Sequence, residues 1–335
     1  MSVSYSLPIG RARERMQDVL FRPFNLGTWF VLGWTAFLAD MFDGGGGGGN
    51  FGSEISDILD KGDGGAGARL FDFPAEHPEI VALIVPLVVL ALVVGIVLFW
   101  VGARGQFMFL DNLVHRRTEV AAPWREYKDQ GNSLFAWTLA FGILVGLGIL
   151  VLGFFGYGVW RGLAPVEGAG GARLALAITA GMLAFVAVVV LMYVSFFLGH
   201  VIVPIMHHRR CSCSQAWSVF GRFFRADPWP FVVYGLLVLG LAIAALCLVL
   251  VAGLGTLCIG FILMMIPYIG TVVTLPVPVF FRALDLEWLV QFGPELYAFP
   301  LPAAPSGEVE GDGAVVGPED LGPDAGGPEP RPEDA

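Results

Sequence analysis

Charged residues are scarce in this chain. Asp, Glu, Lys and Arg make up 14% of its 335 residues, whereas 56% are hydrophobic and the mean hydropathy is +0.72. A soluble fold has too little interior to bury so much apolar side chain. The composition therefore excludes a secreted enzyme, a nucleic-acid-binding domain and a disordered scaffold, and it indicates a protein of the lipid bilayer.

Cysteine is also rare, and its distribution excludes a disulfide framework. Two of the four cysteines, Cys211 and Cys213, lie in an arginine-rich segment, and the other two, Cys247 and Cys258, lie in apolar runs. Small secreted domains held together by disulfides have a much denser pattern of cysteines.

One local group of residues has the chemistry of metal ligands. It consists of His207, His208, Cys211 and Cys213, and on a helix His208 and Cys211 would share a face. Two arginines interrupt the group, and the loops contain no second Cys/His pair that would complete a tetrahedral site. We therefore predict neither a metal nor a cofactor.

Ionisable residues are missing from the middle of the long apolar runs. A helix needs about 20 apolar residues to cross the hydrocarbon layer. Six candidates comprise residues 26–42, 80–101, 134–160, 174–199, 231–252 and 256–281. Proton-coupled carriers and intramembrane proteases place ionisable groups at mid-depth, so both classes are disfavoured. The sequence also lacks a nucleophile elbow, a P-loop, a zinc-protease motif and paired catalytic carboxylates, and we predict no enzyme.

These runs predict an all-α, polytopic membrane protein with six transmembrane helices. The first run is short enough to compete with a cleaved signal peptide. However, 25 residues precede it, and Phe37 instead of a small residue lies two positions before Ala39, the candidate cleavage residue. We therefore predict a retained anchor. In the sixth run, Pro267, Pro276 and Pro278 predict a kinked or interrupted helix.

Fifteen of the 19 basic residues fall on one side of the predicted spans. The positive-inside rule makes this side the cytoplasm, so we expect a multi-pass protein of the inner membrane with both termini cytoplasmic. We divide the chain into an amphipathic N-terminal segment (residues 1–25), a membrane domain (26–286) and a mostly disordered acidic tail (287–335). The membrane domain includes a glycine-rich exoplasmic loop (43–78) that we expect to be mobile.

An internal repeat is visible in the loops between the predicted spans. His-Arg-Arg, followed by six residues and Trp, occurs as His115-Arg116-Arg117 with Trp124 and as His208-Arg209-Arg210 with Trp217. A degenerate version precedes the first span. The pattern predicts three repeated helix hairpins, each with an amphipathic cytoplasmic helix.

The cytoplasmic segments place aromatic residues on one helical face and arginines largely elsewhere. This pattern is typical of helices that lie flat at the membrane interface. We predict that they contact membrane lipids, anionic lipids included, through basic and aromatic residues. The predicted contact residues are Arg104, His115, Arg116, Arg117, Trp124, His200, His208, Arg209, Arg210 and Trp217. The alternative is that these helices pack beneath the bundle as connectors.

Two further features concern the helices themselves. The third span has a glycine face, for which close helix packing is the first interpretation and space for a lipid chain or ligand the second; it consists of Gly142, Gly146, Gly153 and Gly156. The second and fourth spans remain apolar beyond the length that a bilayer requires. They either project into the cytoplasm as continuous rods or break, one near Gly102 and Gly105 and the other near Pro204.

The segment from Val101 to Asp111, together with Trp124-Arg125 and Leu134-Phe135, resembles a loose group of prokaryotic six-helix membrane proteins of unknown function. It is also similar to the membrane domain that accompanies some glycerophosphodiester phosphodiesterases. The resemblance extends over residues 10–286 and implies a six-helix membrane domain. The chain has no phosphodiesterase domain, so no catalytic residue is carried over.

These observations lead to a non-catalytic integral membrane protein, either lipid-associated or organising a partner. The expected partners are membrane lipids and a protein bound by the acidic tail, whose other interpretation is a solubilising end, and nucleic acid is not expected. An uncoupled transporter or lipid translocator is the alternative. A membrane-embedded enzyme comes third, because it would require His200, Arg104 or His208 to meet in one polar cleft.

Overall fold

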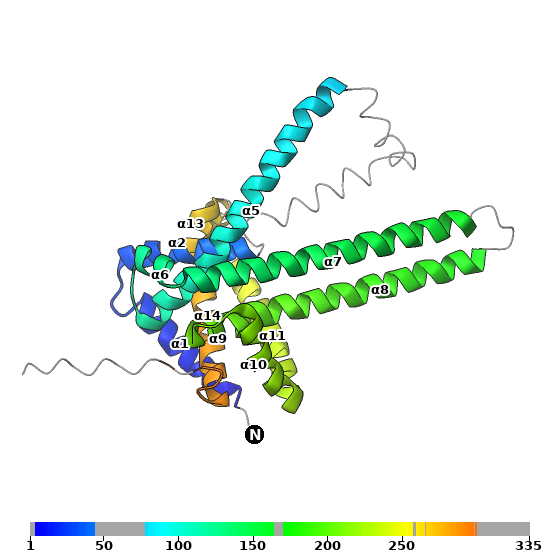
Figure 1. The fold of residues 1–335 in the computed structure, drawn as a ribbon. Coiled ribbons are helices and arrows are strands. Elements are labelled where there is room, and N and C mark those ends of the chain that lie inside the picture. Colours follow the sequence, from blue (N-terminus) through cyan, green and yellow to red (C-terminus); the bar gives the residue numbers. More distant parts are fainter. Residues whose placement is uncertain are drawn as a thin grey trace, which may run out of the picture. The chain divides into compact units, whose positions relative to one another are not determined.

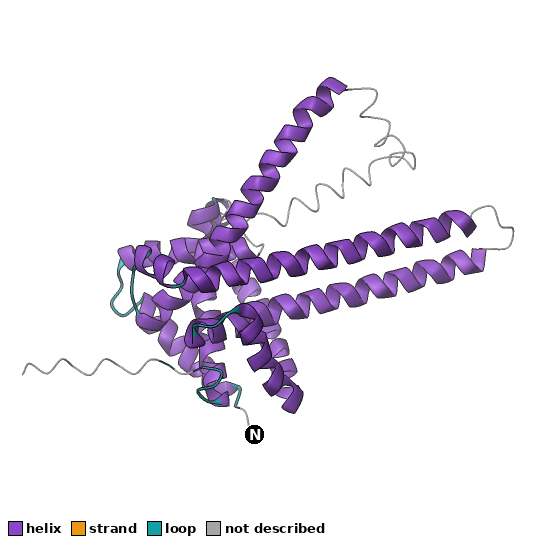
Figure 2. Ribbon diagram, viewed as in Figure 1, coloured by secondary structure: helices purple, strands orange, loops and turns teal. Residues whose placement is uncertain are grey.

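The structure is a computed structural model that describes residues 4–43, 78–163, 170–256, 259–264, 266–297 and 299. The chain divides after Phe299, and every described residue belongs to the first unit, Met1–Phe299. All secondary structure in the described residues is helical (Figure 2). The prediction of a mobile loop falls almost entirely outside the described residues, and so does the prediction of a disordered tail beyond residue 299.

Four helical rods are long and apolar enough to cross a membrane (Figure 1). They are α5 (Pro78–His115), α7 (Lys128–Leu163), α8 (Gly170–Phe197) with its continuation, and α11 (Trp229–Gly255). Their most apolar stretches are at most 6% buried within the chain. Exposed apolar surface of this extent needs lipid to cover it, which agrees with a membrane protein.

The first and sixth predicted spans have a different form. The helix α2 (Leu26–Asp43) is shorter than the four rods. The sixth run is interrupted, as its prolines predict, and forms α12 (Ile259–Met264), α13 (Pro267–Val273) and α14 (Pro276–Leu289). Pro267 and Pro276 each open a new helix, because proline lacks the N–H that would continue the preceding one. Six spans in three repeated hairpins therefore stay a prediction.

The buried core lies at one end of the long helices. The helix α5 has 38 residues, about 57 Å, which exceeds the roughly 30 Å of hydrocarbon. It passes through Gly102 and Gly105 without a break, and its last turns are buried. The fourth run continues from α8 through a π-helical turn, η1 (Leu198–Ile202), into α9 (Val203–Arg209). Of the two alternatives, a continuous rod and a break, the structure therefore has the continuous rod in α5, and in the fourth run a helix that continues past a π turn.

The short helices pack against this core. The helix α1 (Ser6–Leu20) contacts α14, and α6 (Ala121–Glu126) lies between α5 and α7 along the chain. The helix α10 (Cys213–Ala226) begins with a capping box formed by Ser212 and Gln215 and buries one face, made of Cys213, Ala216, Val219 and Phe220. These buried faces favour the interpretation of the amphipathic helices as connectors, because the face expected to meet lipid is used for packing.

The acidic tail begins later than predicted. The helix α14 extends to Leu289 and is followed by the 3-10 turn η2 (Val290–Phe292). Trp288 is fully buried and Tyr297 is 1% exposed. Residues 287–297 thus belong to the folded unit, because two large aromatic side chains anchor them in the core.

Close glycine packing occurs in α5. A Cβ atom at Gly102 would lie 2.7 Å from the backbone nitrogen of Phe42, and one at Gly105 would lie 2.7 Å from the backbone carbon of Leu38. Among the described residues nothing lies within 4 Å of a Cβ at the predicted packing glycines Gly142, Gly146, Gly153 and Gly156. The described part of the chain therefore makes no close helix contact through that face, because no neighbouring helix approaches it.

Candidate functional site

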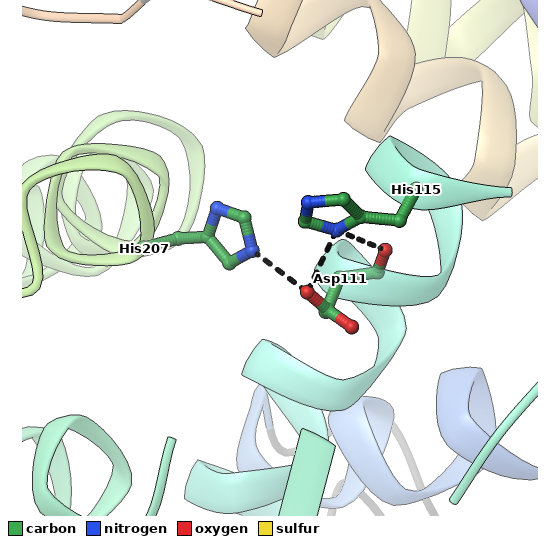
Figure 3. A group of neighbouring side chains, drawn as sticks. All are labelled: Asp111, His115 and His207. Carbon is green, nitrogen blue, oxygen red and sulfur yellow. Dashed lines mark hydrogen bonds and ion pairs between the residues drawn. The ribbon is translucent and has the colours of Figure 1, made fainter. Parts of the chain in front are cut away.

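A buried carboxylate, Asp111, lies at the junction of α5, α6 and α9. Its side chain is fully buried, and His115 Nδ1 lies 2.9 Å from Asp111 Oδ1. His207 Nε2 lies 3.5 Å from the same oxygen, so both imidazole rings face one carboxylate (Figure 3). Asp111 and His115 are one helical turn apart in α5, whereas α9 supplies His207.

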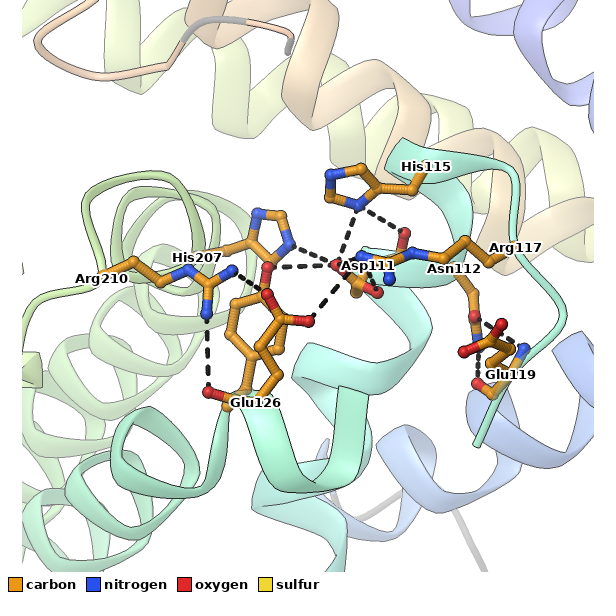
Figure 4. Close-up of polar contacts among 9 residues, drawn as sticks. Asp111, Asn112, His115, Arg117, Glu119, Glu126, His207 and Arg210 are labelled. Carbon is orange, nitrogen blue, oxygen red and sulfur yellow. Dashed lines mark hydrogen bonds and ion pairs between the residues drawn. The ribbon is translucent and has the colours of Figure 1, made fainter. Parts of the chain in front are cut away.

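Tyrosine and arginine side chains complete this group, which we call the Asp111 cluster: Asp111, His115, Arg117, Glu126, Tyr127, His207 and Arg210 (Figure 4). Tyr127 donates a hydrogen bond to Asp111 Oδ1 at 3.1 Å, and Arg117 Nη2 lies 3.2 Å from Asp111 Oδ2. The Tyr127 ring stacks on His207 with centroids 4.7 Å apart. Burial, followed by the Asp111 charge, raises the pKa of Tyr127, so its hydroxyl remains a donor.

Glu126 balances the arginines of the Asp111 cluster. Arg210 forms an ion pair with Glu126 and lies over the Tyr127 ring, 4.0 Å from its centroid. Arg117 also approaches Glu126, at 3.8 Å. Two arginines and two carboxylates therefore form a connected group. In addition, Asn112 holds the α5–α6 connection through two hydrogen bonds to the backbone of Glu119, of 2.8 and 3.2 Å.

A cleft of about 450 Å³ opens where the long helices leave the core. Residues from α2, α5, α7, α8, η1, α11 and α14 line it, and most of its surface is apolar. Its ionisable side chains are Asp40, His200, Arg282 and Asp285. The cleft therefore combines apolar walls with a small number of polar groups, as small-molecule sites do.

Asp285 and Arg282 organise the polar side of this cleft. Asp285 is fully buried, with its Oδ1 atom 2.7 Å from His200 Nδ1 and accepting a 2.7 Å hydrogen bond from Tyr234. Arg282 donates to the Gly199 carbonyl at 2.5 Å and to Gln106. The π-helical turn that contains Gly199 and His200 changes the helical hydrogen-bond register, a feature that often marks functional positions.

The predicted lipid-contact residues do not form one surface. His115, Arg117 and Arg210 belong to the Asp111 cluster, and His200 lines the cleft. Arg104 lies over both Trp100 and Trp124, at 4.3 and 4.8 Å from the ring centroids.

The other predicted contact residues make separate contacts. Arg116 lies 3.4 Å from Asp18. His208 and Arg209 contact the backbone carbonyls of Pro294 and Glu295, and Trp217 stacks on Trp137 with centroids 5.4 Å apart. All ten predicted residues thus have partners inside the protein, because the segments that connect the long helices fold onto the core.

The two repeat copies also differ in structure. Arg116 follows α5 with φ of 52°, and Arg210 follows α9 with the same φ. The left-handed residue is the second member of the first His-Arg-Arg and the third member of the second one. The copies are therefore offset by one residue at the helix end.

The side chains of His207, His208, Cys211 and Cys213 do not face a common point where a metal ion could bind. His207 faces Asp111, whereas His208 Nε2 lies 3.1 Å from the Pro294 carbonyl. Burial raises the pKa of the Cys213 thiol to about 12, which disfavours the thiolate that a metal binds.

Sequence patterns did not identify Asp111, Tyr127, Tyr234, Arg282 and Asp285 as site residues. The available signal was an acidic residue in apolar surroundings, as Asp111 after Phe109-Leu110 and Asp285 between Leu284 and Leu286. A carboxylate in such a run is costly to bury without partners, so it indicates a buried polar contact.

The model of a family of unknown function (DUF7544) matches residues 7–292. The chain belongs to this family. No curated protein and no solved structure matches the chain. Membership agrees with the expected resemblance to uncharacterised proteins, whereas the similarity to phosphodiesterase-associated membrane domains stays a prediction.

Proposed function

We propose that this protein is a non-catalytic membrane module that binds a phospholipid head group in the cleft beside His200 and Arg282. The observation that supports the proposal is a cleft of about 450 Å³ with mixed polar and apolar walls at the base of long helices whose apolar faces are exposed. A head group needs polar partners at the level where its acyl chains enter the hydrocarbon. The cleft offers polar groups for the head group and apolar walls for the start of the acyl chains, within the span of one lipid molecule.

The lining supports this division of roles. Ser195 and His200 bring polar atoms to the cleft, and His200 is 26% exposed, so a ligand can reach its ring. Phe42, Val238 and Phe281 supply apolar walls. The outer faces of α8 and α11 are exposed and apolar, and we propose that the acyl chains lie along them.

We also propose that the core lies on the cytoplasmic side of an inner membrane. Most of the described arginines belong to the core end, and fifteen of the 19 basic residues of the chain fall on the side predicted to be cytoplasmic. The positive-inside rule supports this orientation. We also propose that the acidic tail binds a protein partner, and the negative charge of the tail is the observation that supports it.

A binding role is preferred to catalysis because the residues expected to form an enzyme site are separated. Arg104 lies over two tryptophan rings and His208 lies beside Pro294, whereas His200 alone of the three lines the cleft. A lipid translocator would use the same cleft but would also move its ligand between leaflets.

The test fills the cleft without removing a charge. Ala242 lines the cleft on α11, and Ala244, exposed two residues further along, lies about 200° around the helix. In Ala242→Trp the indole should occupy the cleft and reduce the phospholipid retained in native mass spectrometry after gentle extraction. Ala244→Trp is the matched control and should retain the wild-type amount.

Equal lipid retention in both variants would contradict the proposed site. Reconstitution in proteoliposomes separates the two binding roles: movement of labelled lipid between leaflets by the wild type, abolished by Ala242→Trp, would replace the static module with a translocator.

A further inference from the structure

The Asp111 cluster contains three potential metal ligands, one carboxylate and two imidazoles, from two helices. One ligand atom of each of Asp111, His115 and His207 lies within 4.8 Å of those of the other two. Two of the three separations are shorter, 2.9 Å from His115 Nδ1 and 3.5 Å from His207 Nε2 to Asp111 Oδ1. Figure 3 shows both rings turned toward the carboxylate.

His207 is the most informative member of this group. Its side chain is 5% exposed, and neither ring nitrogen has a hydrogen-bond partner among the described residues. The 3.5 Å contact of His207 Nε2 to Asp111 Oδ1 lacks the geometry of a hydrogen bond, whereas Asp111 Oδ2 has its ion pair with Arg117. A buried polar group left without a partner is destabilising and rare, so such a group calls for a ligand or an ion.

We propose that Asp111, His115 and His207 bind a divalent transition-metal ion of the Zn²⁺ type. Two imidazole nitrogens and one carboxylate oxygen suit borderline ions such as zinc, whereas calcium and magnesium prefer oxygen alone. With metal–ligand distances of about 2.0–2.2 Å, tetrahedral ligands lie about 3.3–3.6 Å apart, so the His207 contact fits directly and the His115 contact after a shift of about 0.4 Å. The longest separation is between the two histidines, and a rotation of the His115 ring, which is 32% exposed, would shorten it.

The surroundings would hold the ligands in place. Tyr127 donates to the Asp111 oxygen that both histidines approach, and its ring stacks on His207 at an interplanar angle of 13°. Contacts of this kind orient metal ligands and raise metal affinity. The positive charges of Arg117 and Arg210 oppose a cation, but Glu126 pairs with both of them and reduces their effect.

The competing interpretation is a polar junction that holds α5 to α9 without a metal. In that case His115 and His207 act only as donors to Asp111, and Zn²⁺ binds weakly or at other side chains. The two interpretations differ in stoichiometry and in which substitutions remove binding.

The experiment measures Zn²⁺ binding by isothermal titration calorimetry on the detergent-solubilised full chain, with metal content determined after dialysis. The site variants are Asp111→Asn and His115→Ala. Because His115 is partly exposed, His115→Ala should fold even if Asp111→Asn does not. His208→Ala is the matched control, since His208 neighbours His207 in sequence and contacts Pro294 instead of the cluster. A Cys211→Ser/Cys213→Ser variant tests the thiols.

We expect the wild type to bind one Zn²⁺ per chain. Loss of a direct ligand should weaken affinity by more than about 100-fold, and Tyr127→Phe should weaken it by about 10-fold, whereas His208→Ala and the cysteine variant should bind as the wild type does. Absence of stoichiometric binding at micromolar Zn²⁺ would overturn the proposal. Binding that survives His115→Ala but is lost with His208 or the cysteines would also overturn it.

Discussion

Replacing Gly105 with alanine tests the packing of α2 on α5. The new Cβ would lie 2.7 Å from the Leu38 carbonyl carbon and 2.8 Å from the Ala39 nitrogen. These are backbone atoms, so the helices themselves must move apart. Overpacking of this kind costs about 1–3 kcal/mol. Alanine also favours the helix by about 1 kcal/mol over glycine, which leaves a net destabilisation of about 0–2 kcal/mol.

The control is Gly221→Ala in α10, where nothing lies within 4 Å of the added Cβ among the described residues. It gains the helix propensity, about 1 kcal/mol, without the clash. The two variants should therefore differ by about 1–3 kcal/mol, with Gly105→Ala the less stable. Thermal unfolding in detergent measures this difference directly. Equal unfolding temperatures, or a more stable Gly105→Ala, would refute the reasoning about the helix crossing.

Two further predictions concern buried polar and thiol groups. Asp285→Ala should destabilise the protein by about 3–5 kcal/mol, because Arg282, His200 and Tyr234 lose a fully buried partner. The control Glu295→Gln changes a side chain that is 60% exposed and should leave the unfolding temperature nearly unchanged. Similar unfolding temperatures for the two variants would contradict the buried network. Burial raises the pKa of Cys213 to about 12, so this thiol should react with maleimide at pH 8 much more slowly than the half-buried Cys211. The comparison uses two variants, each of which keeps only one of these cysteines. Fast labelling of Cys213 in the folded protein would contradict its burial.

Local sequence was sufficient for much of the helical architecture. Hydropathy over about 20 residues predicts four helices that the structure contains at matching positions, because spanning length and internal hydrogen bonding depend on adjacent residues. Pro267 and Pro276 predicted the interruption of the sixth run from local sequence too, since each proline lacks the N–H that would continue the preceding helix.

Other predictions depended on the tertiary neighbours of each residue. Gly105 and Gly142 are both glycines in long apolar helices, yet only the first meets another backbone. Arg117 and Arg210 looked like lipid contacts because arginine is common at interfaces, but in the fold each has a carboxylate partner. The type of a residue limits the contacts that it can make, and the packing of the helices determines which of these contacts form.

The amino-acid sequence by itself determined that the chain is helical and apolar over four membrane-length segments. Only the tertiary structure decided that Asp111 meets His207 from a different helix and that Asp285 meets His200 beside a cleft. The physical reason is range: helix formation and membrane crossing depend on residues a few positions apart, whereas a site depends on which distant helices pack together.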